Sequence, residues 1–300
     1  MTKRLTYIAL LAAAAQLVAQ PQGTKTYATA EEARDAVIQA ASQGIEALRI
    51  VFGPGSTEVV RTGDSVLDNK LVADFSRRAA EKVQLEPEPL NPNRITLLTG
   101  NEESPFALPL IRKNGRWYWD VQEGKTEIRH RVIGANELDT LVVCRGYVEA
   151  QQEYAETDRN GNGVLEFATK IGSTPGKKDG LYWAGEDSPV AEGFAKASAQ
   201  GYSTPGSGKG YHGYVYKILL SQGPDARDGV QDYVVHGLMI GGFALVAWPA
   251  EYGVSGIMTF IVNQDGVVYE KDLGPTTGTL AKAMTRFNPD KSWGISPDQP

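Results

Sequence analysis

Cysteine is nearly absent from this sequence. The 300 residues contain one, Cys144, so no disulfide bond can form within the chain. We expect Cys144 to be a small buried residue on a helix rather than a reactive thiol. The fold must therefore be stabilised by packing, or by packing together with a metal ion.

Positive charge is also scarce. The formal net charge is −6, and it becomes −8 if Lys3 and Arg4 are removed with an N-terminal leader, because 28 basic and 36 acidic residues then remain. A protein that binds nucleic acid or an anionic membrane through its overall charge carries the opposite excess. We therefore expect no nucleic-acid partner.

The sequence has one notable apolar run, and it lies at the N-terminus. Lys3 and Arg4 precede the apolar stretch Leu5–Ala15, and Leu17-Val18-Ala19 is a tolerable cleavage site before Gln20. A retained membrane anchor is the alternative, but the run is shorter than the ~20 residues needed to span a bilayer. The pattern predicts a signal peptide at residues 1–19, a periplasmic or secreted protein, and no stable membrane insertion after cleavage.

No motif of the sequence matches a known catalytic or nucleotide-binding pattern, although several come close. Gly253–Gly256 is not the G-x-S-x-G elbow, and no H-E-x-x-H pair occurs. The glycine–lysine turns at Pro175–Gly180 and Ser207–Gly210 lack the spacing of a phosphate loop, and Gly237–Gly242 lacks that of a dinucleotide fingerprint. We expect Gly241 and Gly242 to permit close approach of a neighbouring segment.

About 280 residues remain after the leader, enough for two domains. The predicted fold class is α+β, with N-terminal helices and a curled antiparallel sheet at residues 24–132. The elements expected there are helices at Ala30–Leu48 and Ser65–Val83, an extended connector at Glu86–Asn93, and strands at Arg94–Thr99, Ala107–Lys113 and Arg116–Val121, the last two joined by an Asn114-Gly115 hairpin.

Residues 133–296 form the second predicted domain, a long helix packed on a roughly four-stranded antiparallel sheet. Apolar residues recur at helical spacing over Ala135–Thr157, and glycine and turn residues then dominate to Gly213. The other elements expected are short helices at Val190–Gln200 and Thr279–Phe287 and strands at Gly213–Leu220, Gly242–Trp248, Ile257–Asn263 and Val267–Lys271, with an Asp265-Gly266 hairpin between the last two.

Several long phrases of the sequence carry a family resemblance. They are TDRNGNGVLEFA at Thr157–Ala168, STPGKKDGLYW at Ser173–Trp183, YHGYVYKIL at Tyr211–Leu219, MIGGFALVAWPAEYG at Met239–Gly253 and MTFIVNQDGVVYEKDLGP at Met258–Pro275. With these phrases the chain resembles the bacterial family known as domain of unknown function 2950, over nearly all of its length after the leader. The resemblance implies export and an envelope setting.

Two broader likenesses concern the fold. The order of helices and strands before residue 132, with NGRWYWDV near its end, resembles the cone fold of the nuclear transport factor 2-like proteins. The second half is similar to the globular part of type IV pilins and pseudopilins, although it lacks their hydrophobic N-terminal membrane helix. A structural calcium ion is part of what the pilin likeness implies.

The sharpest local motif is Asp158-Arg159-Asn160-Gly161-Asn162-Gly163, the first half of a calcium loop. Asp158, Asn160 and Asn162 supply alternating oxygen ligands, and Glu166 stands at the ninth place. The twelfth place, which needs a bidentate glutamate, is Thr169. A turn rich in asparagine and glycine for backbone reasons explains the same residues. Both interpretations stay open: a calcium site, or a turn.

Other groups of residues admit a functional and a structural interpretation. His212 and His236 could meet near Asp232 or Glu251, but a strand histidine is usually structural. The aromatic residues of the second domain are either packing or an exposed protein- or glycan-binding surface. They are Tyr182, Trp183, Tyr202, Tyr211, Tyr214, Tyr216, Trp248 and Tyr252.

We therefore predict a non-catalytic binding or assembly component of the bacterial envelope, with envelope proteins as its partners. The alternative is a small-molecule binder or hydrolytic enzyme that uses a pocket in the first domain. Phe75, Trp117 and Trp119 would line that pocket.

Overall fold

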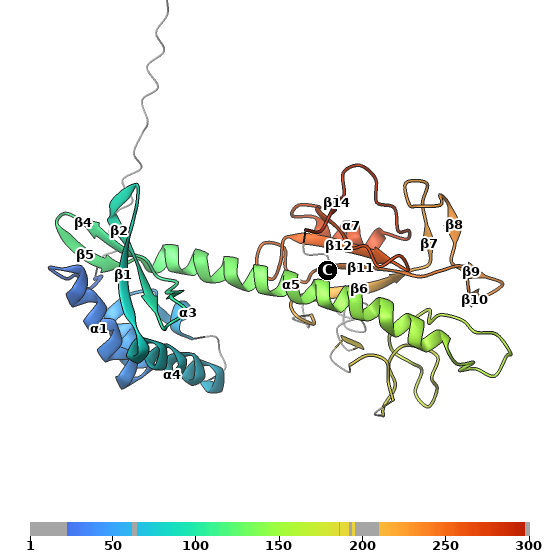
Figure 1. Ribbon diagram of the computed structural model, residues 1–300, viewed down its shortest axis with the longest axis horizontal. Coiled ribbons are helices and arrows are strands. Elements are labelled where there is room, and N and C mark those ends of the chain that lie inside the picture. The colour runs from blue at the N-terminus through green and yellow to red at the C-terminus, as the bar shows by residue number, and fades with distance from the viewer. Residues whose placement is uncertain (1–22, 62–64, 186, 192–193, 196–209, 298–300) are drawn as a thin grey trace, which may run out of the picture. The chain divides into compact units, whose positions relative to one another are not determined.

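The computed structural model describes residues 23–61, 65–185, 187–191, 194–195 and 210–297. The chain divides into two compact units, Met1–Ile128 and Arg129–Pro300 (Figure 1). Both contain helices and antiparallel sheets, so the α+β class is confirmed. The predicted signal peptide lies outside the described residues, as does most of the predicted helix Val190–Gln200. Among the described helices, none is both long and apolar enough to cross a membrane.

The first unit places its helices before its sheet in the chain, as predicted. The strand order is β1-β2-β4-β5, β3 also pairs with β2, and every pair is antiparallel. The elements are α1 (Ala30–Gln43), α2 (Ile45–Phe52), α3 (Thr57–Val60), α4 (Ser65–Glu81), β1 (Val83–Glu88), β2 (Asn91–Thr99), β3 (Ser104–Pro105), β4 (Leu110–Lys113) and β5 (Arg116–Trp119).

The single helix predicted at Ala30–Leu48 is wrong, because two helices occupy this stretch. Gly44 interrupts it with a φ of 97°, a left-handed value that glycine adopts without steric cost. At the other end of α1, the Thr29 hydroxyl accepts a hydrogen bond from the Glu32 N–H, and the Glu32 carboxylate accepts one from the Ala28 N–H. These two bonds make a variant of the capping box, in which the carboxylate accepts from the residue before the N-cap, and they fix where the helix begins.

The extended connector predicted at Glu86–Asn93 is also wrong. The chain there makes a hairpin in which β1 pairs with β2, with Pro87 opposite Ile95. The prolines are compatible with this hairpin because neither stands where a second neighbouring strand needs its N–H. Pro87 lies on an edge strand, where no second neighbour needs its N–H, and Pro92 precedes the part of β2 that pairs with β4.

Aromatic residues fill the core of the first unit. The Asn114-Gly115 hairpin is present, with φ of 53° and 77° and Lys113 paired with Arg116. Trp119, on the strand that follows, is 1% exposed and meets Phe52 and Phe106 edge to face. The sheet and helices therefore share one apolar cluster.

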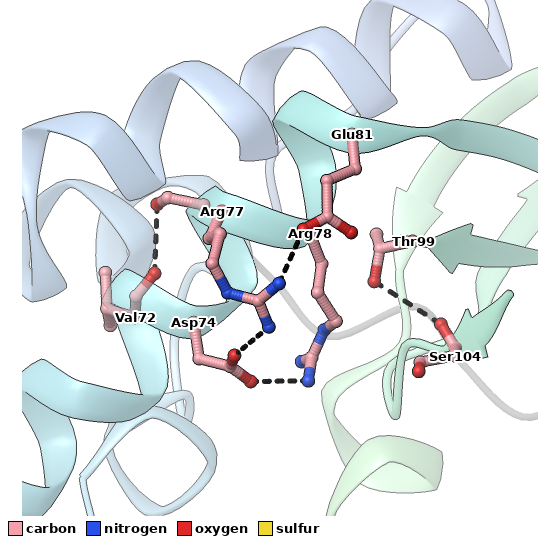
Figure 2. Close-up of polar contacts among 8 residues, drawn as sticks. Val72, Asp74, Arg77, Arg78, Glu81, Thr99 and Ser104 are labelled. Atoms are coloured by element: carbon pink, nitrogen blue, oxygen red, sulfur yellow. Dashed lines mark hydrogen bonds and ion pairs between the residues drawn. The ribbon is translucent and has the colours of Figure 1, made fainter. Parts of the chain in front are cut away.

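Helix α4 presents a charged outer face, drawn in Figure 2. The Asp74 carboxylate accepts hydrogen bonds from both Arg77 and Arg78, and Arg77 also pairs with Glu81. These spacings of three and four residues bring the side chains together on the helix surface. The network is exposed to solvent, and its two arginines and two carboxylates neutralise one another.

Helix α5 (Val121–Ala155) begins 14 residues before the predicted Ala135. Val121, predicted to end a strand, is instead its first residue. The cause is Asp120, whose Oδ1 accepts the N–H groups of Gln122 and Glu123 and so caps the helix. Cys144 is fully buried on this helix, as expected, and burial raises the pKa of its thiol to about 12.

The second unit is built on a five-stranded antiparallel sheet of order β14-β13-β12-β11-β6. Its strands are β6 (Tyr214–Leu219), β11 (Ala244–Pro249), β12 (Met258–Asn263), β13 (Tyr269–Asp272) and β14 (Gly294–Ile295). Four of them match the predicted strands closely. The hairpin at Asp265-Gly266 is wrong as a two-residue turn, because Ile261 pairs with Tyr269 and the connection between them is longer.

One helix lies on each face of this sheet (Figure 1). On one face the Tyr147 hydroxyl of α5 donates to the carbonyl of Ala244 in β11. On the other, the Lys217 ammonium of β6 donates to the carbonyl of Lys282 in α7 (Thr277–Ala283). Two small antiparallel pairs complete the unit: β7 (Ser221–Gln222) with β8 (Gln231–Asp232), and β9 (Val234–Val235) with β10 (Leu238–Met239).

Gly241 and Gly242 let the segment before β11 approach its neighbours, as predicted. A Cβ on Gly241 would lie 2.5 Å from the Asp232 carbonyl oxygen, and one on Gly242 would lie 2.9 Å from the Tyr233 ring. Neither distance is compatible with a side chain. The two glycines are required by the packing of the backbone.

Candidate functional site

The loop that follows α5 folds around the carboxylate of Asp158. One oxygen, Oδ1, accepts the N–H groups of Gly161 at 2.7 Å and Asn162 at 3.2 Å. The other, Oδ2, accepts the N–H of Gly163 at 2.8 Å. Gly161 and Gly163 have φ of 73° and 81°, which allows the chain to curl this tightly.

Glu166 closes the loop from its other end. Its Oε1 accepts hydrogen bonds from the side-chain amides of Asn160 and of Asn162, the second at 3.4 Å. The amide oxygens of these asparagines accept the N–H groups of Asn162 and Val164 at 3.0 and 2.8 Å. Hence all four predicted ligands, Asp158 included, lie in one turn.

The chemistry of this donor set fits a hard cation in part. Two carboxylates and two amide oxygens are the ligand types that calcium prefers. Hydrogen bonds from backbone N–H groups, Gly163 first, hold the pKa of Asp158 below its ordinary value, so this carboxylate is charged at neutral pH. Against a complete site, the described residues contain no cluster of three or more His, Cys, Asp or Glu side chains placed to hold a metal ion.

Arg159, the second residue of the loop, fixes the loop to the rest of the unit. Its guanidinium lies 5.3 Å from the centre of the Tyr154 ring and 5.1 Å from that of Trp183. It also donates to the carbonyl of Tyr154 at 3.3 Å. Two cation–π contacts of this kind contribute ~0.5–1 kcal/mol each at exposed sites. Sequence reasoning missed this role, because the motif assigns nothing to its second position.

A pocket of about 610 Å³ lies beside strand β6, and no pattern in the sequence pointed to it. It is lined by β6 and the residues after it, by the segment Thr169–Gly172, and by Asp232, Val234 and Thr285. Its ionisable lining side chains are Lys170, Lys217 and Asp232. The Lys170 ammonium is already paired with Asp179 at 2.8 Å.

The histidines are not brought together as a site. His212 adopts a φ of 49° in the turn before β6, and its Nδ1 lies 2.8 Å from an Asp139 carboxylate oxygen. His236 occupies the turn between β9 and β10, also with positive φ. Asp232 lies on β8, and Glu251 accepts the Ser255 N–H through its carbonyl. Histidine is one of the residues that tolerate positive φ, so the backbone of these two turns explains why histidine stands there better than a catalytic or metal-binding role does.

The aromatic residues mainly pack. Trp183, Tyr214, Tyr216 and Trp248 are buried, and Tyr182 and Tyr211 are partly buried against the same core, while Tyr202 lies outside the described residues. In the first unit, Phe75, Trp117 and Trp119 are each less than 9% exposed and belong to one apolar cluster. Those three side chains fill the interior instead of lining a pocket.

The comparison with protein families gives one match. The family described as Protein of unknown function (DUF2950) matches residues 24–295. No curated protein and no solved structure matches the chain.

Proposed function

We propose that this chain, which belongs to the DUF2950 family over residues 24–295, is an exported, non-catalytic binding or assembly component of the bacterial envelope. We propose also that a calcium ion stabilises its second unit. The family has no described activity, so both proposals rest on the residues of this chain. Export rests on the basic and apolar leader at residues 1–19. The long helix α5 laid on an antiparallel sheet supports a pilin-like assembly role.

The observation that carries the calcium proposal is the convergence of Asp158, Asn160, Asn162 and Glu166 in one turn. Both asparagine amides point their nitrogens at the Glu166 carboxylate. A half-turn about the last side-chain torsion exchanges these nitrogens for oxygens, which are cation ligands, and gives up the hydrogen bonds that the oxygens accept from the N–H groups of Asn162 and Val164. The ion would then take the place of the two amide donors opposite Glu166.

Calcium would act on the loop rather than on a substrate. The described residues 158–185 contain no helix and no named strand, and Cys144 offers no disulfide to tie this segment down. An ion bound to the native state alone adds RT ln(1 + [L]/Kd), about 2.7 kcal/mol at one hundred times Kd. The loop would become the anchor for that segment.

The test is thermal unfolding of the full chain in calcium and in chelator. We expect calcium to raise the melting temperature of the unchanged protein, and magnesium to raise it less, because magnesium demands a stricter octahedron. Glu166→Gln keeps the shape of the side chain and removes one ligand charge, so it should weaken calcium binding at least tenfold by titration calorimetry.

Glu156→Gln is the matched control. Glu156 is an exposed carboxylate near the end of α5, so this variant makes the same change in net charge outside the loop. It should bind calcium as the unchanged protein does. Equal melting temperatures in calcium and chelator would remove the ion from the proposal.

A further inference from the structure

Strand β6 is an edge of the five-stranded sheet, and alternate residues along it face away from β11. Gly213 accepts the Ala250 N–H on the β11 side, whereas Tyr214 bonds with Tyr211 on the other side. The same alternation places the backbone groups of Ile218 on the outer edge. Beyond the strand, the Leu220 carbonyl also faces outward, since it accepts the Tyr233 N–H.

Several backbone groups on this outer edge are left without a partner among the described residues. Within the part of the chain that the structure describes, no hydrogen bond engages the N–H or C=O of Ile218 or the N–H of Leu220. Unpaired strand groups are a template for another strand. Tyr211 bridges Tyr214 at one end of the edge, and Tyr233 bonds Leu220 at the other, so the open stretch is short.

The pocket beside β6 lies along this same stretch. Lys217, Ile218, Leu220 and Ser221 line it, together with the segment Thr169–Gly172 and with Asp232, Val234 and Thr285. The carbonyls of Lys170 and Ile171 already accept the N–H groups of Leu181 and Tyr182. These two carbonyls are therefore not free to accept a hydrogen bond from an occupant, whereas the Ile218 carbonyl of β6 is. A volume of about 610 Å³ holds a few residues, not a large ligand.

One lining charge has no opposite charge beside it. The Lys217 ammonium donates to the carbonyls of Lys282 and Met284, both at 2.7 Å, which leaves one of its three protons. Among the described residues it forms no ion pair, and Lys170 is neutralised by Asp179. Partial burial lowers the pKa of Lys217, consistent with an ammonium that lacks a carboxylate. Asp232 lines the pocket from β8, across from Ser221.

We propose that an extended peptide segment of a partner protein adds to the outer edge of β6, between β6 and Thr169–Gly172, with one carboxylate side chain set against Lys217. The backbone hydrogen bonds to Ile218 and Leu220 supply affinity, and the carboxylate supplies selectivity. This inference names the partner class of the proposed binding role, but it uses none of the calcium ligands.

The first test needs no ligand. Amide hydrogen exchange of the full chain should be fast at Ile218 and Leu220 and slow at Lys217 and Leu219, whose amides pair with β11. Slow exchange at Ile218 and Leu220 in the isolated protein would mean that the chain covers its own edge, and it would overturn the proposal.

The second test uses a capped heptapeptide, Thr-Val-Thr-Glu-Thr-Val-Thr, as the probe. Binding should slow exchange at Ile218 and Leu220, and the central glutamate should bind at least fivefold more tightly than glutamine in its place. That preference should vanish in Lys217→Gln. Protection at other residues, or equal affinity for the two peptides, would contradict the assigned edge or the assigned charge.

Leu220 offers a matched pair of variants. Its side chain is 46% exposed, so Leu220→Ala should leave binding within about twofold. Leu220→Pro removes the outward N–H as well and should weaken binding at least tenfold. Equal binding by the two variants would exclude strand addition. Peptide binding is measured both in calcium and in chelator, and the calcium-dependent rise in melting temperature is measured separately. A protein that shows this rise but binds no peptide would contradict strand addition and leave the calcium site standing.

Discussion

The two units use their polar side chains in opposite ways. In the first unit they form exposed ion pairs on helices, such as Asp74 with Arg77 on α4. In the second, uncharged side chains are buried and bond to the backbone of loops. The Gln151 side chain accepts a hydrogen bond from the Ala168 N–H through Oε1 at 2.8 Å and donates one to the Ala168 carbonyl through Nε2 at 2.9 Å. Gln222 likewise donates to the carbonyls of Arg227 and Gly229, both at 2.7 Å.

The difference follows from where backbone groups find partners. Regular helices and strands satisfy most backbone groups in the first unit. The second unit contains long loops, whose buried N–H and C=O groups need side-chain partners instead. A single helix residue, Gln151, serves both polar groups of Ala168 at once. The buried side-chain amides therefore hold the loops of this unit to its core, as disulfides hold the loops of cysteine-rich proteins. The comparison predicts large losses from small changes in the second unit and small losses from charge changes in the first.

The largest effect should come from Gly256→Ala in the second unit. An added Cβ would lie 2.6 Å from two carbons of the Tyr214 ring. That ring cannot move easily, since its hydroxyl donates to the Met258 carbonyl at 2.9 Å and the side chain is fully buried. We expect a loss of about 3 kcal/mol in the free energy of unfolding of this unit, measured by denaturant titration with amide exchange as a local readout.

Gly278→Ala is the control for that variant. A Cβ at this position, inside α7, meets nothing within 4 Å. Alanine there should be neutral or stabilise the unit by up to ~1 kcal/mol. Equal stability of the two alanine variants would show that the Tyr214 ring is free to move, and the picture of a rigid second unit would be wrong.

The next effect in size should come from Gln151→Leu. The leucine has similar volume but leaves both the N–H and the C=O of Ala168 without their partner in a buried position. An orphaned buried group costs ~1–3 kcal/mol, and with each of the two near the lower end of that range we expect a loss of about 2 kcal/mol, with faster amide exchange at Ala168. Gln152→Leu is the matched neighbour: Gln152 is exposed, and its replacement should change the unfolding free energy by less than ~0.5 kcal/mol. Similar losses in both would remove the special role of the buried amide.

Local patterns were sufficient to predict much of the fold. Periodicity located α4 and four strands of the second sheet, and Asn114-Gly115 identified its hairpin, because each signal resides in adjacent residues. The failures came where position in a sheet or a cap decided the outcome. Pro87 is tolerated because β1 is an edge strand, and α5 begins early because Asp120 caps it. Neither fact is visible before the neighbours are known.

The candidate sites divide in the same way. The Asp158 loop could be predicted from sequence because its four predicted ligands lie within nine residues, and the structure brings these side chains together. The pocket beside β6 could not, because Lys170, Lys217 and Asp232 come from three distant segments. The pairing of His212 with Asp139 was missed for the same reason, since the two are far apart in the chain.

The smallest effect should come from Asp74→Asn on α4. The hydrogen bond from Arg77, aided by the charge of Arg78, holds the pKa of Asp74 below its ordinary value. A carboxyl group with a lowered folded-state pKa stabilises the native state above its unfolded pKa of about 4, and this contribution is lost as the pH falls below that. Because the group is exposed and screened by salt, we expect no measurable change in unfolding at neutral pH and 0.15 M salt, and only a slightly flatter acid limb in the variant. A loss comparable to that of Gln151→Leu would mean that the surface network of the first unit is as important to stability as the buried amides of the second, and the contrast between the two units would not hold.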